Sequence, residues 1–259
     1  MTDKLVGKAR RRISEDLVGC GVIRGGTLLV HSSLSALRHG SGADVPGGAE
    51  TVIRGLLEVL GAEGTLLMPA LSYATVNLDA PVFDARTTPG NVGIIPETFR
   101  LCEGTLRSTH PSHSVCAIGP RAEELLSDHE MDETPCGTHS PFQRLRQGGQ
   151  LLFLGCGIRP NTSMHAVEEV AEAPYLFGDR VTWRGTTMDG REVGGRYQQH
   201  GFDGWRQRYD RMEALLPSDA LRRGTVLGSD AVLIQIPEMW TAGLVAIKRD
   251  PYHFVQRYD

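Results

Sequence analysis

The segment NTSMHAVEE, residues 161–169, places a histidine three positions before a carboxylate. If this segment is helical, His165 and Glu168 lie on the same face, within hydrogen-bond reach of each other. A carboxylate that holds one imidazole nitrogen fixes the tautomer and raises the basicity of the other nitrogen, as a general base requires. An ordinary solvated His–Glu pair beside a helix cap has the same spacing, so the pair indicates proton-transfer chemistry without establishing it.

The start of this expected helix carries a second chemical feature. Asn161, Thr162 or Ser163 is expected to cap the helix with its side chain. The hydroxyls of Thr162 and Ser163, together with the free N–H groups of the first turn, would also suit the negative oxygen of an acyl-transfer intermediate.

Two further segments combine hydroxyls with histidines. They are HSSLS, residues 31–35, and RSTHPSHS, residues 107–114. One interpretation is that their hydroxyls and backbone groups bind a polar cofactor or its phosphates. The other is that the first is a helix N-cap and the second a loop anchored by proline. A metal site made of His110, His113, His165 and Glu168 has no recognised ligand spacing, so we expect no metal.

The elements that must position these residues alternate along the chain. Buried strands are expected at 27–30, 64–72, 114–120 and 150–157, because each is a short, nearly continuous apolar run. Helices are expected between and after them, at 8–22, 47–64, 93–104, 121–130, 140–149, 161–169 and 205–221. A further strand followed by a last helix is expected within 226–251. Residues 73–93 show no clear period, and turn signals predict an antiparallel hairpin within 180–200.

This order predicts an α/β protein with a mostly parallel central sheet, helices on both faces and a late antiparallel addition. Ligands of such sheets bind at the carboxyl ends of the strands. The segments at 31–35, 72–93 and 158–169 follow expected strands, and the segment at 107–114 comes just before the strand at 114–120. They are therefore expected to converge on one edge of the sheet.

Composition limits the class of protein. The 259 residues are 40% hydrophobic and 22% charged, and the net charge of −4 argues against nucleic acid as a partner. The N-terminus lacks a secretory signal and no apolar run approaches the ~20 residues of a membrane span, so no membrane partner and a cytoplasmic location are expected. The five cysteines are widely spaced, which predicts reduced thiols. We expect a single domain over residues 1–259.

Several catalytic motifs are absent from the sequence. It contains no G-x-S-x-G elbow, no phosphate-binding G-x-x-x-x-G-K-[ST], no dinucleotide-binding G-x-G-x-x-G and no H-E-x-x-H. The absence removes the usual support for a serine hydrolase, a P-loop enzyme or a simple dehydrogenase.

Six segments in series resemble the aminoglycoside 3-N-acetyltransferase family, the antibiotic N-acetyltransferases that use acetyl-CoA. They are VHSSLSAL, GGAETVIRGLLEVLGAEGTLLMPALSY, FDARTTPGNVGIIPETFR, RSTHPSHSVCAIG, SPFQRL and LLFLGCGIRPNTSMHAVEE. The resemblance implies a three-layer α/β/α fold, acetyl-CoA as cosubstrate, no metal, and direct transfer from a ternary complex. It leaves a homodimer open.

The resemblance also assigns roles to residues of this sequence. His165 matches the catalytic histidine and Glu168 the acid that orients it, and the hydroxyls of Thr162 and Ser163 fall where the thioester carbonyl is held. The residues that match the walls around CoA are Ser32, Ser33, Leu34, Ser35, Arg107, Ser108, His110 and Ser114.

The acceptor implied by the resemblance is the 3-amino group of a 2-deoxystreptamine aminoglycoside. Acids and aromatics would hold such a polycation, and the candidates are Tyr73, Asp79, Asp84, Glu169 and Glu172, with Asp203 and Asp210 as further acids. Few acids follow the second strand, so another small amine is an alternative acceptor. A non-catalytic CoA-binding or antibiotic-binding protein and a metal-dependent hydrolase are alternatives of other classes.

Overall fold

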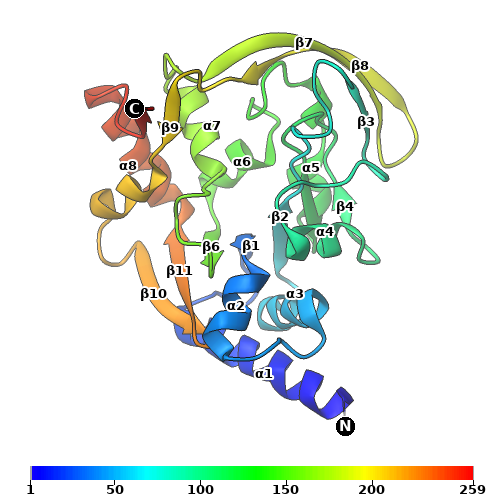
Figure 1. Cartoon of the computed structure of the whole chain (residues 1–259), viewed down its shortest axis with the longest axis vertical. Helices are drawn as coiled ribbons and strands as arrows, with labels where there is room; N and C mark the ends of the chain where they lie inside the picture. The colour runs from blue at the N-terminus through cyan, green and yellow to red at the C-terminus, as the bar shows by residue number, and fades with distance from the viewer. Residues whose placement is uncertain (1, 259) are drawn as a thin grey trace.

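The computed structural model describes residues 2–258 and is organised around a seven-stranded sheet (Figure 1). The strands lie in the order β10-β11-β6-β1-β2-β5-β4. Their bounds are β1 (Thr27–Ser32), β2 (Thr65–Pro69), β4 (Leu106–Arg107), β5 (Val115–Ile118), β6 (Gln150–Leu154), β10 (Leu221–Val226) and β11 (Ser229–Gln235). β6, β1 and β2 pair in parallel, whereas β11 and β5 run against their neighbours. Five strands therefore point one way and two the other, which confirms a mostly parallel sheet.

Helices cover both faces of this sheet. Along β6, Leu152 and Leu154 pack into one apolar cluster and Leu151 and Phe153 into another, because successive side chains of a strand point to opposite faces. The first cluster is completed by α1 (Thr2–Cys20), α2 (Leu34–Ser41), α3 (Gly48–Leu60) and α4 (Ile94–Arg100). The second is completed by α5 (Ala122–Leu126), α6 (Pro141–Arg144), α7 (Ser163–Val170) and α8 (Ile236–Arg249). The predicted three-layer α/β/α fold is confirmed.

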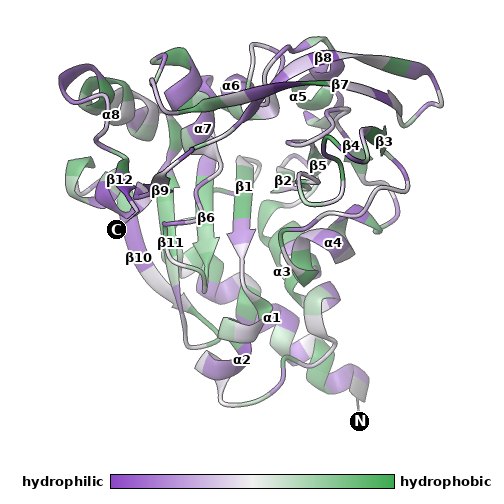
Figure 2. Ribbon diagram, turned by 45° about the horizontal axis from the view of Figure 1, so that its top comes forward, coloured by the Kyte–Doolittle hydropathy of each residue, from purple (hydrophilic) through white to green (hydrophobic). Residues whose placement is uncertain are grey.

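The late antiparallel addition forms a separate small sheet. β7 (Phe177–Thr186) and β8 (Glu192–His200) pair as the predicted hairpin, and β3 (Val82–Asp84) joins β7 in parallel. β3 lies in the segment 73–93 that showed no period. The hairpin extends across one end of the central sheet (Figure 1). It carries both polar and apolar residues, whereas β6 and the first part of β1 are mostly apolar (Figure 2).

The prediction of a helix over 205–221 was wrong in extent and in type. Residues Trp205–Gln207 form strand β9, which pairs with β12 (Val255–Arg257) near the C-terminus, and Tyr209–Leu215 form the 3-10 helix η3. The strand depends on a distant partner, Val255 opposite Gln207, and on stacking of Trp205 against Tyr252, with ring centroids 4.7 Å apart. The pattern of neighbouring residues carries no information about a partner so distant in the sequence. Two short 3-10 helices, η1 (His129–Met131) and η2 (Leu145–Gln147), complete the fold.

Two expectations from composition concern the whole chain. All five cysteines are free thiols, as their spacing predicted. Within residues 2–258, no helix has both the length and the apolar character needed to cross a bilayer.

Candidate active site

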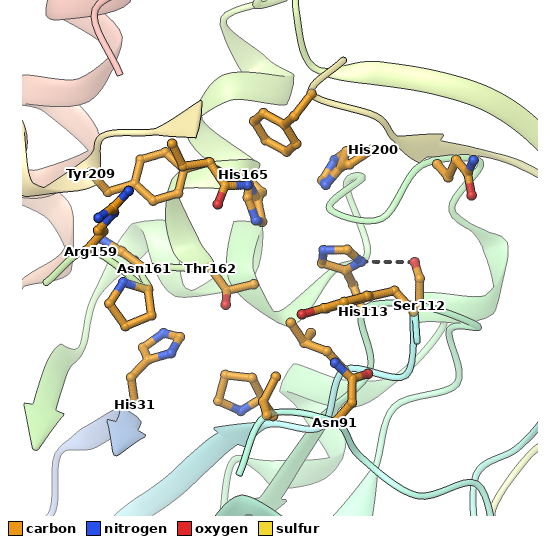
Figure 3. Close-up of a pocket in the computed structure, with 18 of the residues that line it drawn as sticks. His31, Asn91, Ser112, His113, Arg159, Asn161, Thr162, His165, His200 and Tyr209 are labelled. Carbon is orange, nitrogen blue, oxygen red and sulfur yellow. Dashed lines mark hydrogen bonds between the residues drawn. The ribbon is translucent and has the colours of Figure 1, made fainter. Parts of the chain in front are cut away.

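A pocket of about 840 Å³ opens at the carboxyl edge of β1, β2 and β6 (Figure 3). Each of the four segments expected at this edge contributes to its lining: His31 and Ser32, Leu71 and Tyr73, Ser112 and His113, and the stretch from Cys156 to His165. The residues that follow β8, from Gly201 to Gln207, close the opposite side. The predicted convergence is confirmed, and β5 contributes its amino end because it runs antiparallel to β2.

His165 lies in the first turn of α7 and belongs to a chain of buried hydrogen bonds. Glu168 is fully buried, with its Oε2 3.3 Å from His165 Nδ1. The Tyr175 hydroxyl donates to Glu168 Oε1 at 2.7 Å, and the Tyr209 hydroxyl donates to Oε2 at 2.8 Å. Since the one proton of Tyr209 is donated to Glu168, its oxygen accepts from His165 Nδ1–H at 2.9 Å. This assignment leaves the lone pair on His165 Nε2, the nitrogen that a general base uses.

The two phenols stabilise the buried carboxylate. Burial, together with the adjacent charge of Glu168, raises the pKa of Tyr175 and of Tyr209 far above that of a free tyrosine. Both therefore remain protonated donors at any physiological pH. A buried carboxylate needs such donors, because unpaired burial of its charge costs several kcal/mol.

Neutral imidazoles surround His165. Burial, and then the charge of neighbouring histidines, lowers the pKa of His113 and of His200 well below the usual value. Burial lowers the pKa of His31 to about 3. The His165 ring centroid lies 4.9 Å from that of His200 and 5.6 Å from that of His113. These rings add no permanent positive charge beside the base.

Thr162 is the N-cap residue of α7 but makes no side-chain capping hydrogen bond. Asn161, the residue before it, accepts from the Ser163 N–H through its Oδ1 at 3.1 Å. Thr162 lines the pocket, and its hydroxyl points into the cavity (Figure 3). The hydroxyl of Ser163 is buried outside the pocket lining and has no hydrogen-bond partner among the described residues. Of the two predicted oxyanion donors, Thr162 is therefore the one at the pocket.

The end of β1 offers polar atoms to a ligand. Ser32 Oγ and His31 Nε2 are buried without a protein partner within residues 2–258, and both residues line the pocket. The His31 ring stacks on Phe153, with centroids 5.2 Å apart. Ser33, Leu34 and Ser35 lie outside the lining: Ser33 Oγ accepts from the Ala36 N–H at the start of α2 and contacts Ser35 Oγ at 3.0 Å.

The four residues predicted to contact the cofactor from the 107–114 segment lie behind the pocket. The buried Arg107 guanidinium donates to the carbonyls of Ala70 and Thr88 and to Ser114 Oγ. Ser114 Oγ also donates to Ala70 O. Ser108 Oγ bonds to the Val115 N–H and to His129 Nδ1. His110 Nδ1 accepts from the backbone N–H groups of Ser112 and His113. These groups hold the loop that presents Ser112 and His113.

The predicted acceptor residues are mostly elsewhere. Tyr73 lines the pocket, but Asp79, Asp84, Glu169 and Glu172 do not. Asp84 pairs with Arg86, and Glu169 accepts from Thr134, Cys136 and His200. Among the described residues, Asp203 is the only acid that lines the pocket, which it shares with Arg159 and Arg206.

Sequence reasoning missed the partners supplied from a distance. Tyr175 and Tyr209 bind Glu168 from segments that carry no motif, and Tyr209 lies in the incorrectly predicted helix. Arg159 and Phe202 were also missed. One signal was available for His200, because it ends a strand of the predicted hairpin.

The chain is similar to proteins of known family. The family model described as aminoglycoside 3-N-acetyltransferase matches residues 29–246. Aminoglycoside N(3)-acetyltransferase VIII of Streptomyces fradiae is 35% identical over 209 residues, covering 68% of this chain and 69% of that protein. Aminoglycoside N(3)-acetyltransferase IV of a Salmonella species is 32% identical over 243 residues, covering 92% of this chain and 87% of that protein.

Solved structures agree with these relatives. The crystal structure of aminoglycoside acetyltransferase AAC(3)-IVa, as a histidine-to-alanine mutant in complex with a gentamicin, matches with a TM-score of 0.80 and 30% identity. The match covers 95% of this chain and 90% of that one.

Proposed function

Because this chain belongs to the aminoglycoside 3-N-acetyltransferase family, we propose that it transfers an acetyl group from acetyl-CoA to the 3-amino group of a 2-deoxystreptamine aminoglycoside. One observation carries the proposal: His165 lines a large pocket, with its Nδ1 proton held by Tyr209 and Glu168. That arrangement presents a base to a bound amine. The family is one of acyltransferases, and related proteins are named for this acceptor position.

The residues of the pocket account for each proton in the transfer. The neutral amine attacks the thioester carbonyl while His165 Nε2 removes its proton, and the Thr162 hydroxyl donates to the oxygen that becomes negative. When the tetrahedral intermediate collapses, the C–S bond breaks. His165 then gives the proton to the departing thiolate and returns to its neutral form. General-base assistance of this kind is worth about 10²–10⁴-fold.

Unpaired polar atoms at the end of β1 support acetyl-CoA as the acetyl donor. Ser32 Oγ and His31 Nε2 are buried donors or acceptors that the protein leaves unused within the described chain, as expected where a ligand supplies the partner. Arg159 and Arg206 line the same pocket, and guanidinium groups suit the phosphates of CoA.

Other residues that line the pocket fit an acceptor amine carried on a sugar-like body. Tyr73, Trp205 and Tyr258 provide flat surfaces, and Asp203 provides one negative charge. A single carboxylate beside two arginines is a weak site for a polycation. This charge balance favours, as a second candidate, the same acetyl transfer to a small amine with fewer positive charges.

An acceptor panel with acetyl-CoA tests both candidates. Thiol release would be followed for 2-deoxystreptamine aminoglycosides and for mono- and diamines, and the acetylated position would be read by NMR. The proposal predicts transfer to the 3-amino group and a rate about 10²–10⁴-fold lower with His165→Ala. Turnover of other amines alone would select the second candidate. Thiol release that is unchanged in His165→Ala would overturn the assignment of the base. Binding without turnover would indicate a non-catalytic CoA-binding or antibiotic-binding protein.

A further inference from the structure

We propose that His113, His165 and His200 together form a binding site for a divalent transition-metal ion such as Zn²⁺. The three residues come from different elements: the loop before β5, the first turn of α7 and the end of β8. One ring nitrogen of each lies within 4.8 Å of those of the other two. Figure 3 shows the three rings around one side of the pocket.

The distances are close to those of a three-histidine metal site. Zinc–nitrogen bonds are about 2.0–2.1 Å long, so two ligand nitrogens of a tetrahedral site lie roughly 3.4 Å apart. Closing the cluster from 4.8 Å to this separation requires each nitrogen to move by less than about 1 Å. Small rotations of the imidazole rings within the pocket provide that movement. The pocket itself supplies an open position for water.

Each histidine has a hydrogen-bond partner on one ring nitrogen, which leaves its other nitrogen for a metal ion. His165 Nδ1 contacts Glu168 and Tyr209, His200 Nε2 donates to Glu169 Oε1 at 2.7 Å, and His113 Nδ1 lies 2.9 Å from Ser112 Oγ. Metal-binding histidines almost always have such a carboxylate or hydroxyl behind them, because it fixes the tautomer and raises the basicity of the ligand nitrogen. Two of the three histidines here have a carboxylate partner.

A second, independent observation concerns His200. Its Nδ1 is buried and has no hydrogen-bond partner among residues 2–258. Because Nε2–H donates to Glu169, Nδ1 must carry the lone pair. A buried acceptor without a donor costs free energy, and a metal ion would satisfy it.

The ligand set indicates the class of metal. Three imidazoles without a thiolate or a carboxylate ligand suit Zn²⁺, Co²⁺, Ni²⁺ or Cu²⁺ rather than Mg²⁺ or Ca²⁺. An ion at this position would take the lone pair of His165. If the proposed acetyl transfer is correct, such an ion would therefore inhibit it, and a chelator would restore it.

Metal binding is tested without substrate, so that its outcome is separate from that of the proposed function. The full chain, stripped with EDTA, would be titrated with Zn²⁺ in a calorimeter and with Co²⁺ by visible absorption. We expect one ion per chain and ligand-field bands typical of low coordination number. His200→Asn and His113→Asn should each weaken binding at least tenfold. Circular dichroism and thermal melts of the metal-free variants would establish that they fold.

Two further variants sharpen the test. Glu169→Gln keeps all three ligands and changes only the group behind His200, so it should weaken binding about 10–100-fold. His39→Asn changes an exposed histidine at the end of α2 and should bind like the unmodified protein. Absence of a stoichiometric ion in the unmodified protein, or equal losses in His39→Asn and folded His200→Asn, would overturn the site.

Discussion

Two walls of the same pocket are built in different ways. The floor, which we define as the segment from Asn161 to Glu169, takes its chemistry from residues a few positions apart. The roof, which we define as residues 197–209, reaches the floor across long stretches of chain: His200 bonds to Glu169 over 31 residues, and Tyr209 bonds to His165 over 44. The comparison separates chemistry that is encoded locally from chemistry that depends on the packing of the whole fold.

The side chains of the floor can be positioned by nearby residues alone, because a buried strand precedes them. β6 is buried along its whole length, and the turn after it leads into α7, where helical geometry alone places Glu168 behind His165. The roof depends instead on the register of β7 against β8, which pairs Phe177 with His200 and shifts between Phe177 and Arg180. A slip of one residue would turn His200 away from the pocket.

The largest expected effect concerns the buried neutral histidines, most of which lie outside both walls. The pKa is lowered in His31, His110, His113, His129 and His200, in each case mainly by burial. The unfolded chain therefore binds more protons than the folded protein below about pH 6.5. Stability should be fully present above pH 6.5 and fall as pH decreases, by about 1 kcal/mol per histidine at pH 5.5. Urea unfolding at pH 8.0 and 5.5 measures this, and equal midpoints would contradict it.

The next largest effect is expected from a substitution in the floor alone. His165→Ala removes the base and should lower kcat by about 10²–10⁴-fold while leaving the affinity for acetyl-CoA nearly unchanged. His39→Ala, on the surface, is the matched control and should retain full activity. If His165→Ala kept more than about a tenth of kcat, the floor would not hold the base.

Glu169 connects the floor to the roof through its hydrogen bond to His200. Its removal should lower the stability of the fold more than the catalytic rate. Glu169→Ala leaves the Cys136 N–H and the His200 Nε2–H buried without an acceptor, at about 1–3 kcal/mol for each group. Thermal melts should then fall by about 2–4 °C per kcal/mol. Glu169→Gln keeps an acceptor oxygen for both donors and should lose much less. Equal losses in the two variants would show that these hydrogen bonds contribute little.

A substitution of Tyr209 tests whether a residue of the roof holds His165 of the floor in its catalytic orientation. Tyr209→Phe preserves the packing but removes the oxygen that accepts from His165 Nδ1–H and the proton donated to Glu168. Loss of a hydrogen bond to a charged group costs about 1.5–3 kcal/mol, or roughly 10–150-fold in rate. Tyr175→Phe removes the other phenol without touching His165 and should affect kcat less. The reverse order would place the orienting role on Tyr175.

The difference between floor and roof also explains what the sequence could predict. The layers, the strands of the central sheet other than β4 and β10, the hairpin and the His165–Glu168 pair follow from periodicity and short spacings. Arg107, Ser108, His110 and Ser114, which were assigned to the cofactor, do not line the pocket, and their polar groups are bonded within the fold. A polar residue type does not reveal whether a ligand or the protein itself is its partner.

The smallest expected effect concerns recognition of the acceptor by the roof. Asp203 is exposed and lines the pocket, so its attraction for an ammonium group acts through water and is worth about 1 kcal/mol or less. Asp203→Asn should therefore raise KM for an aminoglycoside by about two- to fivefold and leave kcat unchanged. Because salt screens exposed charges, raising the ionic strength should increase KM in the unmodified protein and less so in Asp203→Asn. Asp79→Asn, outside the pocket, is the control. If salt and Asp203→Asn both leave KM unchanged for a polycation while a less charged amine binds more tightly, the roof is built for the second candidate acceptor.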